Sequence, residues 1–318
     1  MDAIDGGAGN DSFNIATSYA VVIPASAAVT NVETMNVTQA SGTAAVTLNS
    51  TKFTGLTALN VTNAGAGTDT LTAAATTNVT NVSSGAAVIN GGLNVSETFT
   101  QATTANGVTS ATIDIGATTA AAGSVTVNAT DTNTYTTHTT AAIATTGGAG
   151  VTINATVNSN QALTAASLIN VVAPTGAVVI NNATNDTATA DAATTITGSA
   201  VTVTGSATLA GASTVVVSNT ATAAQVAVGT STITQGVVTV TGGTATTAVT
   251  VNQTNTATAV ATVKAVAGVT AVTAVPGTAG IAAVTGVTGV TAVPAVTGKV
   301  GAVAGQVIIA DGNGSSAT

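Results

Sequence analysis

The sequence predicts an all-β protein built as a β-solenoid, a parallel β-helix or β-roll with rungs of about 24 residues. Short segments that alternate apolar and hydroxyl side chains run through most of the chain, and they recur at intervals close to that length. Helix signals are poor, because Thr, Val, Asn and Gly are weak helix formers and only 4% of residues are charged. Stacked β-sandwich modules remain the alternative, since they also read as short alternating strands with turn signals.

The predicted strands have a period of two, which places Val on one face and Thr on the other. Small β-branched residues suit a thin, repetitive interior, whereas a thick globular core leans on large aromatic and aliphatic side chains. Aromatics make up only 2% of this chain, and Trp is absent. The clearest alternating segments are Val46–Leu48, Val125–Val127, Val151–Ile153, Val201–Thr204 and Val249–Val251.

Asparagines mark the repeat. Asn36 and Asn60 occupy the same place in two similar segments, one predicted rung apart. Further along, the polar residues expected to close strands are Asn128, Asn154, Asn181 and Thr204, followed at irregular steps by Ser218, Thr241 and Asn252. Roughly 13 rungs would give a rod about 60 Å long, and the recurring asparagines are expected to stack as ladders.

The charge balance excludes several classes of function. The chain has 11 acidic and 3 basic residues, a net charge of −8, and Lys52, Lys264 and Lys299 are far apart. Binding of nucleic acid or of an anionic membrane surface is therefore not expected. No run of 18 apolar residues predicts a membrane-spanning helix. Because the start lacks a signal peptide, we expect the chain to be a segment of a longer protein.

Residues suited to catalysis are scarce. Cysteine is absent, so neither disulfides nor thiolate chemistry exist. His138 is the only histidine and lies in a Thr-rich run, while Asp186 and Asp191 fall in a turn-like stretch that favours a solvated loop. Sites that cleave polysaccharides need clustered carboxylates, Arg and aromatic platforms. We therefore expect a protein that is not an enzyme.

One motif carries a specific chemistry. Residues Gly6–Asn14 (GGAGNDSFN) fit the nonapeptide G-G-x-G-x-D-x-U-x at every fixed position. The glycines permit a tight turn, Asp11 supplies a hard oxygen and Phe13 caps the interior. This segment resembles the RTX calcium-binding repeats of proteins exported by bacterial type I secretion. The resemblance implies calcium, held by Asp11 with carbonyls around Gly6, Gly7 and Gly9 and completed by a neighbouring turn.

Only one full copy of the motif is present, which predicts half of a calcium site. The degenerate copy at 65–71 (GAGTDTL) has Ala64 in place of the first glycine but keeps Asp69, a second candidate metal ligand. Another copy at 147–153 keeps the glycines and has Thr152 in place of the Asp. The alternative is a Gly-rich turn without metal.

The Thr-rich segment at 30–38 (TNVETMNVT) follows an RTX-like turn in a chain without cysteine. In this combination the chain resembles bacterial surface-layer proteins. The resemblance implies a secreted structural protein of the bacterial cell surface or extracellular matrix. Such a protein would assemble with itself into a lattice or filament, helped by calcium, and a cell-surface polysaccharide is a further candidate partner. Large RTX adhesins share this composition, so an adhesin stalk or spacer is the alternative; an ice-binding Thr-x-Thr face is disfavoured by the irregular steps.

The amino-acid composition changes along the chain and suggests three regions. Residues 1–75 hold the RTX-like turn and the first rungs, and residues 76–256 form a Thr- and Val-rich solenoid body. Residues 257–318 are a low-complexity region of Val, Ala, Gly and Thr, in which the segment 268–276 recurs with one mismatch at 286–294.

Overall fold

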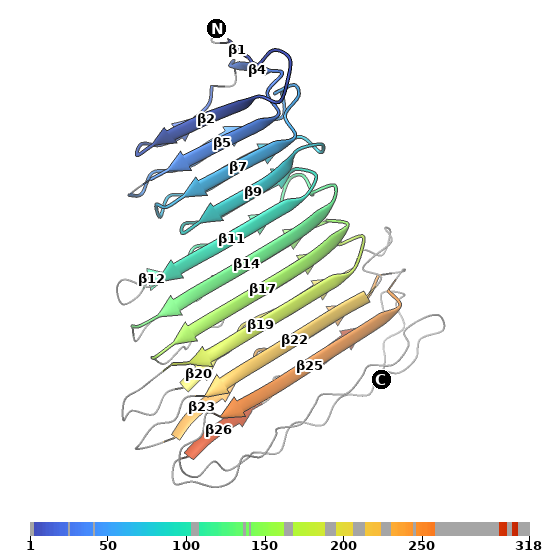
Figure 1. Ribbon diagram of the computed structural model, residues 1–318. Coiled ribbons are helices and arrows are strands. Elements are labelled where there is room, and N and C mark those ends of the chain that lie inside the picture. The colour runs from blue at the N-terminus through green and yellow to red at the C-terminus, as the bar shows by residue number, and fades with distance from the viewer. Residues whose placement is uncertain are drawn as a thin grey trace.

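The protein is a parallel β-solenoid (Figure 1). The computed structural model describes residues 3–24, 26–40, 42–102, 108–135, 138–139, 141–161, 168–187, 195–205, 214–223, 230–243, 246–257, 299–303 and 307–310. Within these ranges the regular elements are all β-strands, and every strand pair is parallel. Because β-sandwiches pair their strands antiparallel, the parallel pairing confirms the solenoid prediction.

Two ten-stranded sheets form the body. The wide sheet has strands of 6 to 10 residues: β2 (Ser12–Thr17), β5 (Thr34–Gln39), β7 (Ala58–Asn63), β9 (Asn78–Ser83), β11 (Val95–Ala102), β14 (Ser124–Asn133), β17 (Gly150–Ser159), β19 (Val178–Asp186), β22 (Thr214–Ala223) and β25 (Ala248–Ala257). The narrow sheet has strands of 2 to 5 residues: β3 (Val21–Val22), β6 (Val46–Asn49), β8 (Asp69–Ala73), β10 (Ala87–Gly91), β13 (Ile113–Ile115), β16 (Ile143–Thr146), β18 (Leu168–Val172), β21 (Ala200–Thr204), β24 (Val238–Thr241) and β27 (Val307–Ala310).

The chain visits the two sheets alternately, so that each rung contributes one strand to each sheet. Shorter strands add a third side to some rungs: β1 (Ala3–Asp5) pairs with β4 (Ala28–Thr30), and β12 (Val108–Thr109) pairs with β15 (His138–Thr139). A three-stranded sheet joins β20 (Thr195–Thr197), β23 (Thr230–Thr234) and β26 (Lys299–Val303).

The spacing between rungs is less regular than the sequence predicted. Asn36 of β5 pairs with Asn60 of β7 at a sequence separation of 24. The separation falls to 16 between β9 and β11, where Asn81 pairs with Glu97. It rises to 37 between β19 and β22. Ten strands stacked about 4.8 Å apart give a body roughly 43 Å long, shorter than the sequence suggested because the longer rungs use more chain.

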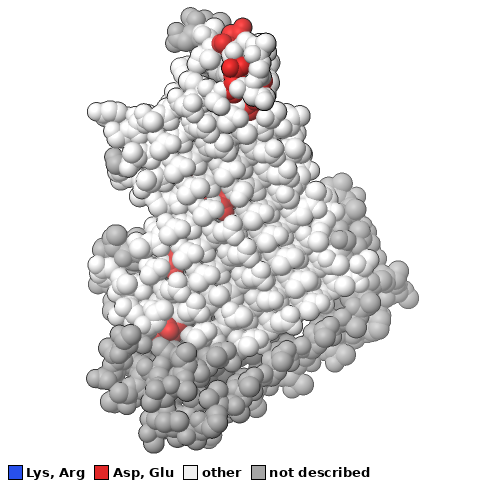
Figure 2. Space-filling view, in the orientation of Figure 1, with Lys and Arg blue, Asp and Glu red and all other residues white. Residues whose placement is uncertain are grey.

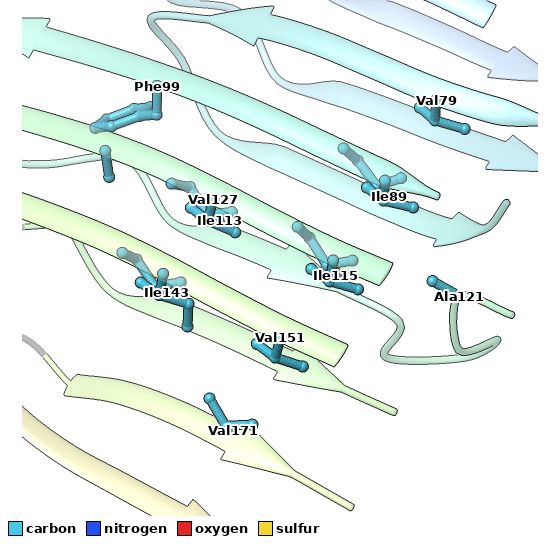
Figure 3. Close-up of a cluster of buried hydrophobic side chains, with 14 of the residues drawn as sticks. Val79, Ile89, Phe99, Ile113, Ile115, Ala121, Val127, Ile143, Val151 and Val171 are labelled. Carbon is cyan, nitrogen blue, oxygen red and sulfur yellow. The ribbon is translucent and has the colours of Figure 1, made fainter. Parts of the chain in front are cut away.

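The interior is a thin layer between the two sheets, filled by the alternate residues of each strand. In β14, Val125 and Val127 are buried while Thr126 and Asn128 lie on the outer face. Facing them across the core are narrow-sheet residues such as Ile113 and Ile143 (Figure 3). The alternation of Val and Thr therefore predicted the inward and outward faces correctly. A single apolar cluster runs from Val21 to Val251, so the core continues across residue 75.

The residues predicted to close strands divide between the two sheets: the asparagines form the predicted repeat in the wide sheet, whereas Thr204 and Thr241 do end strands, β21 and β24. Asn36 pairs with Asn60, and Asn128, Asn154 and Asn181 stand in one register column. These asparagines lie inside long strands rather than at their ends. Thr204 and Thr241 belong to the narrow sheet, which explains the irregular steps after Asn181.

Asparagine ladders form on the outer face of the wide sheet, as expected. The Asn154 Nδ2 group donates to Oδ1 of Asn128 at 2.8 Å, and Asn181 donates to Asn154 at 2.8 Å. The same contact joins Asn36 to Asn14 at 2.7 Å and Asn60 to Asn36 at 2.9 Å. In each contact, the side-chain oxygen of one asparagine accepts a hydrogen bond from the side-chain amide of the asparagine in the next rung.

Most of the low-complexity region, including the repeat at 268–294, lies outside the described residues. Two of its segments belong to the solenoid: β26 pairs with β23, and β27 pairs with β24.

Candidate calcium site and interior carboxyl groups

The RTX-like motif forms the turn between β1 and β2 at the N-terminal end of the rod. Gly7 and Gly9 have φ angles of 87° and 132°, a backbone region that favours glycine. The turn rests on the next rung, because the Gly6 N–H donates to the Thr30 carbonyl at 3.0 Å. The Asp11 carbonyl accepts from the N–H groups of Glu33 and Thr34 at 3.2 and 3.1 Å. The sequence motif therefore folds into the glycine turn that it predicts.

Acidic side chains gather around this turn, and Figure 2 shows them as the red patch at the N-terminal end of the rod. Asp5 Oδ1 accepts from the Gly7 N–H at 3.1 Å and from Asn31 Nδ2 at 2.9 Å. These hydrogen bonds, the one from Asn31 foremost, hold the pKa of Asp5 below its ordinary value. Glu33 Oε2 accepts the Asp11 N–H at 2.7 Å. Both Asp5 and Glu33 are thus engaged with donors of the turn.

The residues of the turn fit a calcium ion in one respect. Asp11 Oδ2 is buried and accepts no hydrogen bond, and an unsatisfied carboxylate oxygen is the ligand that a hard cation uses. Asp11 with the carbonyls around Gly6, Gly7 and Gly9 would hold the ion. Among the described residues no group of three or more His, Cys, Asp or Glu side chains is arranged to hold a metal. If calcium binds here, the turn would supply half of a coordination shell.

Asp69, the second candidate ligand, lies elsewhere. It begins β8 in the narrow sheet and is fully buried inside the solenoid. Its Oδ1 accepts from Asn63 Nδ2 at 2.6 Å and its Oδ2 from Asn81 Nδ2 at 3.2 Å. The structure does not bring Asp69 into the turn that contains Asp11, and both of its oxygens are engaged by amide donors.

The glycines before Asp69 have a packing role. A Cβ atom on Gly65 would meet the Gly42 carbonyl oxygen at 2.6 Å, and one on Gly67 would overlap the backbone of Ala44. Gly85 stacks against the Gly67 carbonyl in the same way one rung later. These positions are glycine because consecutive turns lie in direct backbone contact. Close packing of turns therefore gives the same glycine pattern in the sequence as a calcium-binding turn.

Glu97 is the interior acid that the sequence reasoning missed. It lies on β11, fully buried, where Ser83 Oγ donates to its Oε1 at 2.6 Å and Asn81 Nδ2 donates to its Oε2 at 2.8 Å. Burial raises the pKa of Glu97 to about 7; the two hydrogen bonds lower it, and the nearby charge of Asp69 raises it further. The alternating segment Val95–Phe99 was the available signal, because it places Glu97 on the same inward face as both apolar ends.

Asp69 and Glu97 therefore form a carboxyl pair bridged by Asn81. Burial also raises the pKa of Asp69, against the hydrogen bonds from Asn63, Asn81 and the Val46 N–H. The side chains that donate to the pair are neutral. A neutral carboxylic acid loses much less by burial than a carboxylate, so the interior favours protonation of the pair.

Two other aspartates of the wide sheet also point inward. Asp131 Oδ2 accepts from Ser110 Oγ at 2.6 Å and from the Ala141 N–H at 3.1 Å, and Asp186 is buried at the end of β19. His138 belongs to β15, and its side chain, like the whole of Asp191, lies outside the described residues.

Comparison of the sequence with known protein families found no match, and comparison with curated proteins found no similar chain. In the described part of the chain no helix is long and apolar enough to cross a membrane.

Proposed function

We propose that this chain is a structural subunit of a bacterial surface layer or extracellular filament, which assembles with itself through its β-surfaces with the help of calcium. The observation that carries the proposal is the unbroken register of the wide sheet through ten parallel strands. Such a body presents a flat, periodic surface and two sheet ends, the geometry from which lattices and filaments are built.

The low charge supports assembly. Natural sheets blunt their edges with charged residues, Lys in particular, and this chain has three lysines in 318 residues. The N-terminal edge strand β2 carries none of them. Backbone groups at a sheet edge without charged side chains are open to pairing with another chain.

Calcium would bind at the turn formed by Gly6–Asp11. It supplies one unsatisfied carboxylate oxygen, and a second turn must complete the shell. A second copy of the chain could provide that turn, which would couple calcium binding to assembly.

Electron microscopy of the negatively stained chain, with and without millimolar calcium, tests the proposal. Ordered sheets or filaments that dissolve in chelator are the expected result. Isolated rods in both conditions would contradict it.

A stalk or spacer of an adhesin is the second candidate. The observation in its favour is the rod itself, since one core runs from the first rungs to β25. A spacer would hold a binding region away from the cell without joining other copies, so the same micrographs separate the two functions.

A further inference from the structure

The outer face of the wide sheet carries no charged side chain in its described strands. Outward positions along these strands are Thr, Asn, Ser, Ala, Val and Gly throughout. The three acids that lie on them, Glu97, Asp131 and Asp186, are all buried on the inward side. On an ordinary solvent-exposed protein surface, about a quarter to a third of the positions are occupied by charged residues.

The narrow sheet differs in both respects. Its strands are at most five residues long, and Asp114 lies at an outward position of β13. Among the described strands of the two large sheets, the absence of charge is therefore combined with width in the wide sheet alone. In Figure 2, the face that carries the wide sheet is almost entirely white between the acidic N-terminal end and the grey atoms.

Several amides of this face already hydrogen-bond to one another. In the ladders, Asn154 accepts from Asn181 and donates to Asn128, and Asn185 donates to Asn158 at 3.0 Å. Burying a polar group is costly when it loses its hydrogen bonds with water. Because these amides bond along the rod axis, a partner can cover them at a lower cost than it could cover isolated amides.

The size and flatness of the face suit a second protein surface. Ten strands about 4.8 Å apart, each 6 to 10 residues long, present on the order of 1,000 Å², above the roughly 800 Å² per partner of a stable interface. The strands run nearly parallel from β2 to β25 (Figure 1), and extended flat sheets are typically stabilised by stacking or by side-chain ladders. Small Thr, Asn and Ala side chains can interdigitate with an identical face, as in steric zippers.

We infer that this face binds the same face of a second copy, so that two rods pack sheet against sheet in a two-fold dimer. The inference rests on the proposed self-assembly and names the surface that makes the first contact. A charged partner has nothing to pair with here, whereas an identical charge-free face leaves no charge buried and unpaired.

A matched pair of variants tests the inference. Thr156→Lys changes an outward residue of β17, an interior strand of the wide sheet, and Thr202→Lys changes an outward residue of β21 in the narrow sheet that is likewise half-buried. Sedimentation of the whole chain should show a dimer that Thr156→Lys weakens by at least about tenfold, because it buries an unpaired charge, and that Thr202→Lys leaves unchanged.

A second measurement does not depend on a charge being introduced. Because the chain lacks cysteine, Thr156→Cys and Thr202→Cys each accept a single nitroxide label. The label at 156 should lose mobility when the protein assembles, and the label at 202 should keep it. Monomer circular dichroism of each variant verifies that the fold is retained.

The outcomes separate this inference from the proposed function. Ordered assemblies in which the label at 156 stays mobile would overturn the inferred face and leave the proposed function standing. Dimers that Thr156→Lys disrupts, without sheets or filaments, would support the face and contradict the lattice or filament. A monomer that binds crystalline cellulose or chitin through Thr156 would assign the face to polysaccharide and overturn the inference.

Discussion

The side-chain amide of Asn81 donates a hydrogen bond of 2.8 Å to Oε2 of Glu97, and both residues are fully buried between the two sheets. The same amide group donates to Asp69. Three neighbouring rungs therefore share one polar cluster at a depth where the other rungs place Val or Ile. We expect this cluster to make the stability of the rod depend on pH.

Stability should fall as the pH rises from about 4.5 to about 7. The pKa of Glu97 is about 7 in the folded protein against 4.5 for the ordinary side chain, so the folded state holds the proton more tightly. Over this range the unfolded state binds fewer protons, which lowers the free energy of unfolding by about 3 kcal/mol. Urea denaturation between pH 4 and 8 measures the change.

Glu97→Gln is the control, because glutamine keeps the shape and does not titrate. Most of the pH dependence in this range should disappear in that variant. The remainder should have the same sign, since the pKa of Asp69 is raised as well. A wild-type stability that increases from pH 4.5 to 7 would contradict this account of the pair.

The ladder through Asn154 should contribute to stability. Asn154→Ala removes the hydrogen bonds with both Asn128 and Asn181, and we expect the free energy of unfolding to fall by about 1 to 2 kcal/mol. Thr152→Ala, two residues earlier on the same outer face, is the matched control and should cost less. Equal losses in urea titrations of the two variants would show that the ladder adds nothing beyond packing.

Calcium should stabilise the chain through Asp11. At a calcium concentration ten times the dissociation constant, binding adds about 1.4 kcal/mol, or about 2 °C in Tm for a chain of this size. Asp11→Asn should abolish the calcium-dependent shift in a thermal melt. Asp114→Asn, an acid on the outer face of β13, should retain it. A shift that survives in Asp11→Asn would place the ion elsewhere.

Gly67→Ala should destabilise the solenoid locally although it adds only a methyl group. Its Cβ atom would overlap the Ala44 backbone, so the two turns must separate. We expect a loss of about 1 to 3 kcal/mol, the usual cost of overpacking. Gly150→Ala is the comparison, since its nearest obstacle is the Ala177 carbonyl oxygen at an ordinary 3.7 Å. Urea melts in which the two variants match would argue against direct contact between turns.

The architecture could be predicted because it follows from short-range patterns. Alternation in Val125–Val127 places Val inside and Thr outside. The sequence separation between Asn36 and Asn60 equals the length of one rung. What the sequence could not separate was the sheet to which each strand belongs. Val201–Thr204 alternates in the same way as the wide-sheet strands, yet it lies in the narrow sheet, because the same period serves both faces of the core.

The site was harder to predict than the fold. Glycine is needed both where a turn curls around a cation and where two turns stack, so Gly65 and Gly67 made Asp69 resemble a metal ligand. The turn at Gly6–Asp11 does fold as its motif indicates. Glu97 was not predicted as an interior group because acids are rarely buried, although Val95 and Phe99 at even spacing place it on the inward face.

The unequal chain length between paired strands has a consequence for the evolution of the molecule. Partners in register have a sequence separation of 16 between β9 and β11 and of 37 between β19 and β22, while the sheets continue without a break. Connections that do not stack backbone against backbone, unlike the turns at Gly67 and Gly85, should therefore tolerate insertions and deletions, provided that the strands keep their alternation. We expect related chains to differ most in the length of such connections, which are also the places where a foreign segment could be inserted while the two sheets stay the same.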